Sequence, residues 1–236
     1  MSESELIEEI TDAEVESLAQ SFNNSAPEEV LRWAVKAFES DVALATAFGP
    51  EGCVLIDMLC RVERQPRIFY LDTDLFFPET YELIDQLAMH YQISFERQAT
   101  DLSLSSQAQA FGPSLWEREP DRCCQLRKVE PLLEKLAGLR AWITAIRRDQ
   151  SSARAAAQVI ERDPKFGLIK INPLVGWSPV EVWKYIFKHN VPYNPLHDQG
   201  FPSIGCAPCT TAVQPGEDPR AGRWRGRVKR ECGLHQ

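Results

Sequence analysis

The chain has 236 residues, 44% of them hydrophobic, which suits a globular protein of one large domain with appended ends. Its net charge of -8 is concentrated in an acidic amino-terminal region, whereas the carboxyl-terminal end is basic. No apolar run approaches the ~18 residues of a membrane span, and the acidic start lacks the basic region of a secretory signal. We therefore expect a cytoplasmic chain without a membrane partner, and the single Trp224 among few tail cations argues against nucleic acid.

Apolar residues recur at helical spacing in 6–21 and 28–38, which predicts a helical segment over the amino-terminal part of the chain. A short apolar strand is expected at 42–46, followed by a glycine-containing loop at 47–52 and a helix at 53–62. This arrangement places backbone N–H groups at a helix start, where phosphate binds favourably. The loop lacks the Gly-Lys-Ser/Thr of a Walker sequence, and many α/β turns contain two glycines, so an ordinary turn remains an alternative.

The same alternation continues along the chain. A second strand is expected at 67–71, a helix at 78–90, a third strand at 93–95, a fourth at 141–146 and a helix at 180–188. Alternating strands and helices predict an α/β fold with a parallel sheet, and such sheets bind ligands at the carboxyl ends of their strands.

The chain has seven cysteines, an odd number, and the reducing environment of the cytoplasm argues against a disulfide framework. Cys123 and Cys124 are adjacent, while Cys206 and Cys209 form a C-x-x-C pair. Structural zinc is one interpretation of four thiolates. Adjacent side chains on a helix diverge by about 100°, however, which suits a four-iron cluster better than one tetrahedral ion. The spacing therefore favours an iron-sulfur cluster over zinc.

Cys232 lies near the carboxyl terminus after a basic run at 220–230. A thiol near a terminus is accessible, and neighbouring cations favour its reactive thiolate form. The run predicts a nucleophile at Cys232, and a solubilising basic tail with an incidental cysteine is the alternative.

Several motifs together resemble the assimilatory adenylyl-sulfate reductases, within the wider family that also reduces the 3'-phosphorylated substrate. They are Cys-Cys-x-x-Arg-Lys at 123–128, Tyr-Asn-Pro-Leu-His-Asp-Gln-Gly-Phe-Pro-Ser-Ile-Gly-Cys-Ala-Pro-Cys-Thr at 193–210, Gly-Glu-Asp-Pro-Arg-Ala-Gly-Arg-Trp at 216–224, Glu-Cys-Gly-Leu-His at 231–235, Leu-Asp-Thr at 71–73 and Arg-Arg-Asp-Gln-Ser at 147–151. Three stretches depart from the common pattern: 47–50 lacks the Ser-Gly of many relatives, Ala145 stands where a glycine is frequent, and Arg225-Gly226 replaces a Trp-rich continuation.

The resemblance implies a Rossmann-like fold of the adenine nucleotide alpha hydrolase or ATP pyrophosphatase type, with a nucleotide-binding domain at 41–210 and a mobile catalytic tail at 211–236. The helical segment at 1–40, expected from its apolar spacing, precedes this domain. It implies one 4Fe-4S cluster on Cys123, Cys124, Cys206 and Cys209, and catalysis by Cys232 with His235. The implied substrate-binding positions are Thr46, Phe48, Gly49, Leu71, Asp72, Thr73, Lys128, Ala145, Arg147, Arg220 and Arg223.

The activity implied is reduction of adenosine 5'-phosphosulfate to sulfite and AMP through an S-sulfonate on Cys232. Because the tail holds no second cysteine, an external dithiol must resolve this adduct, and the resemblance names thioredoxin or glutaredoxin. The sequence does not determine whether the protein forms a homo-oligomer. Two alternatives remain at this point: a reductase of 3'-phosphoadenylyl sulfate, and a zinc-stabilised module that binds nucleic acid or a protein partner.

Overall fold

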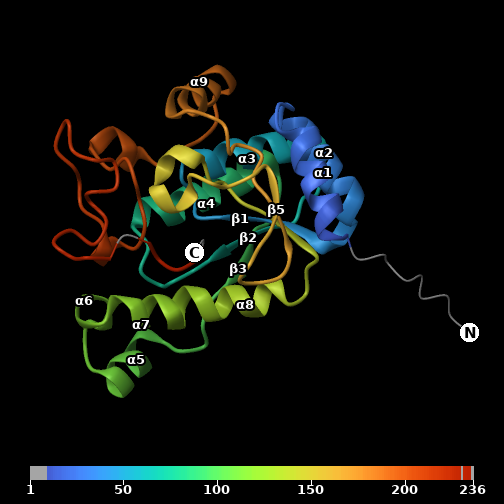
Figure 1. Cartoon of the computed structure of the whole chain (residues 1–236). Coiled ribbons are helices and arrows are strands. Elements are labelled where there is room, and N and C mark those ends of the chain that lie inside the picture. Colours follow the sequence, from blue (N-terminus) through green and yellow to red (C-terminus); the bar gives the residue numbers. More distant parts are fainter. Residues whose placement is uncertain (1–9, 230, 235–236) are drawn as a thin grey trace, which may run out of the picture.

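The computed structural model describes residues 10–229 and 231–234. Within these residues the chain forms a six-stranded sheet of order β3-β2-β1-β4-β6-β5 (Figure 1). The strands are β1 (Val42–Thr46), β2 (Ile68–Leu71), β3 (Glu96–Gln98), β4 (Ala141–Ile143), β5 (Ile160–Arg162) and β6 (Ile169–Ile171). All neighbouring strands pair in parallel except β5, which runs antiparallel to β6 at the edge. The expected α/β fold with a mainly parallel sheet is confirmed.

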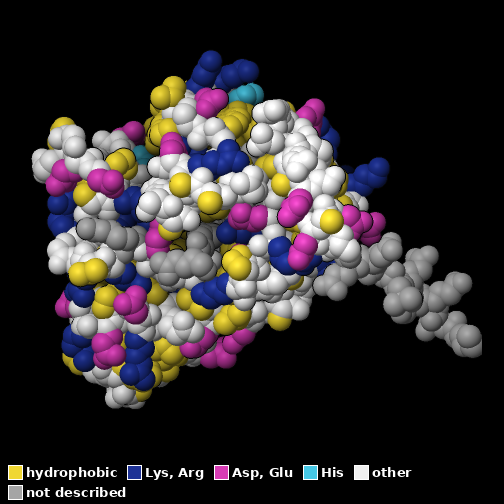
Figure 2. All heavy atoms as spheres, viewed as in Figure 1, with side chains coloured by type: hydrophobic (Ala, Val, Ile, Leu, Met, Phe, Trp, Pro, Cys, Tyr) yellow, Lys and Arg dark blue, Asp and Glu magenta, His cyan; other side chains and the backbone are white. Residues whose placement is uncertain are grey.

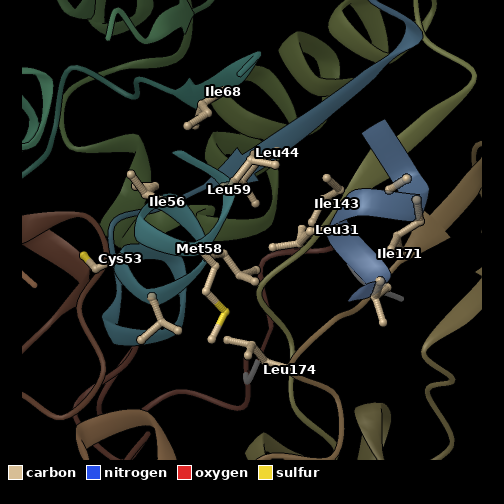
Figure 3. Close-up of a cluster of buried hydrophobic side chains, with 14 of the residues drawn as sticks. Leu31, Leu44, Cys53, Ile56, Met58, Leu59, Ile68, Ile143, Ile171 and Leu174 are labelled. Atoms are coloured by element: carbon tan, nitrogen blue, oxygen red, sulfur yellow. The ribbon is translucent and has the colours of Figure 1, made fainter. Parts of the chain in front are cut away.

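Both faces of the sheet are buried, as expected for parallel strands. Successive side chains of a strand point to opposite faces, so each strand contributes to the packing on both sides. Leu44 and Ile68 belong to a large apolar cluster on one face, part of which is drawn in Figure 3. Their neighbours Ala43 and Phe69 belong to a smaller cluster on the other face, together with Trp142 of β4. The apolar runs of β1, β2 and β4 therefore supply two cores at once.

Nine α-helices lie among the described residues. They are α1 (Asp12–Phe22), α2 (Pro27–Phe38), α3 (Pro50–Val62), α4 (Pro78–Tyr91), α5 (Leu104–Phe111), α6 (Leu115–Arg118), α7 (Pro120–Cys124), α8 (Glu130–Leu136) and α9 (Pro179–His189). Helices α2, α3, α4 and α9 contribute to the large cluster, and α8 contributes to the small one. Figure 1 accordingly shows α3 and α9 on one side of the sheet and α8 on the other.

The expected third strand at 93–95 is wrong. Gln92 ends α4 in the left-handed conformation, and the N–H of Ile93 still donates to the carbonyl of Ala88 in that helix. Residue 93 is thus part of the helix end, and strand pairing starts only at Glu96, opposite Phe69. The strands β5 and β6 were not expected, since each has only three residues and shows no clear alternation.

The adjacent cysteines stand at the end of α7, which continues through a π-helical turn at Gln125–Val129 directly into α8. A π turn carries more residues than an α turn and is frequent at functional sites. Arg127 of this turn is almost completely buried. The helix therefore changes its pitch at the point where it leaves the cysteine pair.

Within the described ranges, no helix is long and apolar enough to cross a membrane. Figure 2 shows Lys and Arg side chains interspersed with Asp and Glu over the face in view. Such mixing differs from the one-sided basic surface that is typical of nucleic-acid-binding proteins.

A buried carboxylate ties three helices of the large cluster together. Asp57 of α3 accepts hydrogen bonds from Arg61 Nε at 2.8 Å, from the Tyr91 hydroxyl of α4 at 3.0 Å and from the Tyr185 hydroxyl of α9 at 2.6 Å. Burial alone would raise the pKa of Asp57, but the hydrogen bonds from Arg61, Tyr185 and Tyr91 outweigh it and hold the pKa below its ordinary value. The folded state therefore favours the charged carboxylate.

We expect Asp57→Asn to destabilise the protein by about 1–3 kcal/mol at neutral pH, because hydrogen bonds to a charged group are lost. A lowered folded-state pKa gives stability that is present above the unfolded pKa of about 3.9 and lost as pH falls through the folded one. Apparent melting temperatures from pH 7 to 3 should thus fall less steeply in the variant than in the wild type. Asp101→Asn, an exposed site, is the control, and parallel curves for all three proteins would contradict the prediction.

Candidate active site

A cavity of about 370 Å³ lies at the carboxyl ends of β1, β2 and β4. Four of the expected nucleotide positions line it: Thr46, Gly49, Leu71 and Ala145. The end of β1 approaches α3 closely, since a Cβ on Gly52 of α3 would lie only 2.5 Å from Oγ1 of Thr46, the last residue of the strand. This edge of the sheet is where parallel α/β folds bind their ligands.

Three other expected positions have side chains that do not line this cavity. The Phe48 ring points into the core, where it packs edge-to-face against Tyr70 with centroids 5.4 Å apart. Asp72 accepts from Arg97 Nε at 2.7 Å, an ion pair on the rim of the sheet. Thr73 is fully buried and faces the cysteines described below. The structure therefore separates these side chains from Thr46 and its neighbours.

Arg147 reaches the cavity from the loop after β4, but carboxylates already surround it. Its Nε donates to Glu51 Oε1 at 2.8 Å, and its Nη1 donates to Asp149 Oδ2 at 2.7 Å. Both carboxylates line the same cavity. The positive charge of Arg147 is thus balanced within the protein.

Arg220, from the start of the tail, is also paired. Its Nη2 lies 3.1 Å from Glu231 Oε2, and the same oxygen lies 3.2 Å from Arg154 Nη2. All three side chains line the cavity. One carboxylate therefore bridges two guanidinium groups beside the tail cysteine.

Lys128 and Arg223 differ from these arginines, because within the part of the chain that the structure describes neither forms an ion pair with a carboxylate. Arg223 is buried, stacks over the Trp224 ring at 4.7 Å and donates to the Ile204 carbonyl at 3.3 Å. It passes so close to Gly205 that a Cβ there would lie 2.2 Å from its Nη2. Lys128 and Arg223 are therefore the cations whose charge is available to an anion in the cavity.

A second, smaller cavity adjoins the first. The four cysteines expected to bind metal all line it: Cys123, Cys124, Cys206 and Cys209. Lys128 and Trp224 line both cavities, so they form the wall between them. The first pair of cysteines comes from the end of α7. In the second pair, Cys206 precedes a short 3-10 helix at Ala207–Cys209, and Cys209 is its last residue. The fold thus brings together two pairs of thiols that are more than eighty residues apart in sequence.

The thiols of this cavity differ in their acidity. Burial raises the pKa of Cys123 to about 12 and that of Cys209 to about 11, with neighbouring thiols adding to the effect. Burial would also raise the pKa of Cys206, but the Lys128 charge and a hydrogen bond with Thr73 at 3.3 Å lower it below its ordinary value. For Lys128, burial acts to lower the pKa, but the charges of nearby thiols, Cys206 first, raise it overall. The cation and the Cys206 thiolate therefore stabilise each other.

The donor set fits a cluster chemically, because four Cys ligands are the usual set for four irons. Arg127 supports this region: it donates to the Thr73 carbonyl, Asp74 Oδ2 and the Leu102 carbonyl, each within 3.0 Å, and so fixes the loop beside Cys206. Among residues 10–229 and 231–234, however, no group of three or more His, Cys, Asp or Glu side chains is arranged so that it could hold a metal ion. Metal binding therefore stays a prediction.

The tail returns to the first cavity and places Cys232 in its lining, half-buried. The carbonyl of Gly233 accepts a hydrogen bond from Lys165 Nζ at 2.6 Å, and Leu234 packs against the small apolar cluster. Upstream, Lys229 forms an ion pair with Asp121 of α7. The tail is therefore docked in this structure, whereas His235 lies outside the described residues.

Sequence reasoning missed Arg154 and Glu231 as members of the site. Arg154 stands among small residues without a recognisable motif, so only the fold reveals its position. Glu231 lies next to Cys232 within the Glu-Cys-Gly-Leu-His motif, yet an acid after a basic run gave no reason to expect it inside a cavity lined by several cations. The sequence shows charges, but it does not show which of them neutralise one another.

The order of the strands and the parallel sheet define an α/β fold of the adenine nucleotide alpha hydrolase type. A solved phosphoadenylyl-sulfate reductase from Candida auris, in a phosphate complex, matches with a TM-score of 0.74 and 35% identity, over 86% of this chain and 98% of that one. An FMN adenylyltransferase from Candida glabrata, 15% identical with a TM-score of 0.57 over 87% of this chain and 77% of its own, shares the fold alone.

The phosphoadenosine phosphosulfate reductase domain model matches residues 41–212, and the chain belongs to this family. It is 49% identical to an adenosine 5'-phosphosulfate reductase of Salinibacter ruber, over 93% of this chain and 87% of that one. It is also 47% identical to a phosphoadenosine 5'-phosphosulfate reductase of Gloeobacter violaceus, over 94% and 93%. Both substrate names therefore occur among similar relatives.

Proposed function

We propose that this protein reduces adenosine 5'-phosphosulfate to sulfite and AMP, with Cys232 as nucleophile. The observation that carries the proposal is the lining of one cavity by the tail thiol and by Lys128 and Arg223, the two lining cations that pair with no carboxylate among residues 10–229 and 231–234. A phosphosulfate needs such charges, and a planar guanidinium matches its oxygens well. The adenosine part would occupy the side of the cavity near Thr46, Leu71 and Ala145.

The reaction would proceed in two steps. The Cys232 thiolate attacks the sulfate sulfur, the bond from that sulfur to the bridging oxygen breaks, and AMP leaves with the electron pair, so that an S-sulfonate forms on Cys232. A dithiol protein, thioredoxin or glutaredoxin, then attacks Cys232 Sγ and releases sulfite. The second thiol of that protein resolves the mixed disulfide, so the dithiol supplies both electrons and becomes a disulfide.

The nucleophile hypothesis has a direct test. Wild-type protein incubated with adenosine 5'-phosphosulfate and no reductant should release one AMP per active chain and gain the mass of one SO3 group on the Cys232 peptide. Reduced thioredoxin added afterwards should release sulfite. If AMP is released without any protein adduct, the covalent mechanism is wrong.

A 4Fe-4S cluster on Cys123, Cys124, Cys206 and Cys209 would lie directly behind Lys128, since that side chain lines both cavities. Such a cluster would supply negative charge that orients Lys128 and Arg223, while thiols supply the electrons. This cofactor assignment rests on the donor chemistry of the second cavity and on the family.

Anaerobically purified protein should contain about four irons per chain, as four-thiolate ligation of a cubane requires. Cys206→Ser should lose this iron and its visible absorption, because a hydroxyl is a poor ligand for the cluster. Cys60→Ser changes a half-buried thiol outside both cavities and should keep the iron. One zinc per chain without iron would instead support the zinc-stabilised module.

The 3'-phosphorylated nucleotide is the second candidate substrate, and the Gloeobacter violaceus relative carries that name. Glu51 and Asp149 already neutralise Arg147 in the cavity, which leaves less positive charge for an additional phosphate. We therefore favour the substrate without the 3'-phosphate. The ratio of kcat/KM for the two nucleotides decides between them.

A further inference from the structure

Glu231, the residue before the tail cysteine, holds two arginines from distant parts of the chain. Arg154 ends a 3-10 helix at Ser152–Arg154, beyond β4, and Arg220 lies where the tail begins. Both guanidinium groups donate to the same oxygen of Glu231, at 3.2 Å and 3.1 Å. The carboxylate therefore joins the tail both to the body of the protein and to the tail's own first turn.

The pair of Glu231 and Arg154 is buried on both sides, whereas Lys229 of the tail pairs with the exposed Asp121. The side chains of Glu231 and Arg154 are 9% and 10% exposed, whereas the pair of Arg225 and Glu217 on the same tail is 43% and 33% exposed. Surface pairs contribute little to stability, but removing one partner of a buried pair leaves an uncompensated charge and is costly. Loss of Glu231 would leave two guanidinium groups facing each other in the cavity without their shared acceptor.

The tail is held on both sides of Cys232. Before it stands the Glu231 bridge, and after it come the hydrogen bond from Lys165 to the Gly233 carbonyl and the packing of Leu234. Of these three attachments, only Glu231 is charged and also lines the cavity beside Cys232. Glu231 is thus placed to decide whether the thiol faces the substrate.

We propose that Glu231 is a positioning residue: its bridge to Arg154 and Arg220 closes the tail over the cavity and so orients the Cys232 thiol toward the sulfate. The bridge also keeps these two arginines from binding the sulfate in an unproductive position. Productive binding of the sulfate is then left to Lys128 and Arg223. The part of this inference that concerns catalysis rests on the proposed function, whereas tail closure does not.

Tail closure is measured first, without substrate, by the rate at which iodoacetamide alkylates Cys232 in the intact protein, followed by peptide mass spectrometry. Glu231→Ala should raise this rate about tenfold, the change that a closing equilibrium weakened by about 1.4 kcal/mol would give. Glu231→Gln, which keeps the shape but not the charge, should give an intermediate increase. Glu217→Ala removes the exposed acid of the same tail and should leave the rate unchanged.

Orientation is measured by single-turnover formation of the Cys232 adduct and, separately, by AMP affinity. Glu231→Ala should slow adduct formation by about tenfold or more, matching the loss of closure, while AMP binds at least as tightly as to the wild type because a carboxylate has left the cavity. Glu231→Asp, which keeps the charge, should restore part of the rate. A residue needed only for folding would weaken AMP binding as well.

The outcomes separate the two proposals. If the wild type forms no adduct, the proposed function fails, and the alkylation rates still decide whether Glu231 closes the tail. If the wild type forms the adduct and Glu231→Ala matches it in both rates, the positioning role is overturned. Should Glu231→Ala fail to fold, as judged by its melting temperature, Glu231→Gln takes its place, and wild-type rates in that variant likewise overturn the proposal.

Discussion

Cys232→Ser should release no AMP from adenosine 5'-phosphosulfate and should carry no SO3 adduct, while its iron content stays at the wild-type level. A hydroxyl is a far poorer nucleophile than a thiolate, so the first step stops. The four cysteines of the second cavity are untouched by the change, because Cys232 lines only the first cavity. The measurement is intact-protein mass spectrometry after a single incubation, together with AMP quantification.

The control for this experiment is Cys60→Ser, which should form the adduct as the wild type does. Cys53 and Cys60 have pKa values raised to about 12 by burial, so neither supplies a thiolate at neutral pH. An SO3 group found on Cys53 or Cys60, or an adduct that persists in Cys232→Ser, would remove Cys232 from the mechanism.

Arg223→Lys should lower kcat/KM by about 10²-fold, which corresponds to about 2.7 kcal/mol of lost transition-state stabilisation. Lysine keeps the charge but loses the planar fork and the stacking over Trp224, and both features matter for recognition of an oxyanion. The fork lies in a buried position with no carboxylate partner among the described residues, so the substrate is the group expected to satisfy it.

Arg225→Lys is the matched control, since Arg225 lies two residues further along the tail and pairs with Glu217 at the surface. Its kcat/KM should stay within about twofold of the wild type, as exposed pairs contribute little. Arg223→Lys with the kinetics of the wild type would show that Arg223 does not hold the phosphosulfate. Equal losses in both variants would point to a general effect of tail charge.

The sequence predicted the central part of the fold well because buried parallel strands leave a strong pattern. Residues 42–46 and 67–71 are short apolar runs bounded by polar or glycine-containing loops, and both contain interior strands of the sheet, β1 and β2. The edge strands were harder, since Ile160–Arg162 and Ile169–Ile171 are too short to show alternation. The prediction of a third strand at 93–95 was wrong because Ile93 is buried as part of a helix end. An apolar residue is buried in a strand and at a helix end alike, so its burial does not distinguish a strand from a helix end.

The site was predictable to the extent that it depends on residue type. The residue type alone identifies cysteines as possible ligands or nucleophiles and Lys or Arg as cations, and the four cysteines line one cavity. Which acidic residue each cation pairs with was not predictable, because ion pairing depends on the tertiary arrangement. Arg220 and Arg223 look alike in sequence, yet Arg220 is bridged to Glu231 and Arg223 stacks on Trp224. The distinction between a neutralised and an available cation exists only in three dimensions.

The π-helical turn at Gln125–Val129 accommodates one more residue between the cysteine pair and α8 than a regular α-helical turn would. Each residue of an α-helix adds about 100° of rotation, so the same sequence wound as a regular α-helix would turn Cys123 and Cys124 by about that angle relative to α8. Because α8 is fixed by its apolar packing against the sheet, the cysteines would then turn away from Cys206 and Cys209. The wide turn therefore lets one continuous helix both pack against the sheet and present its thiols to the second cavity.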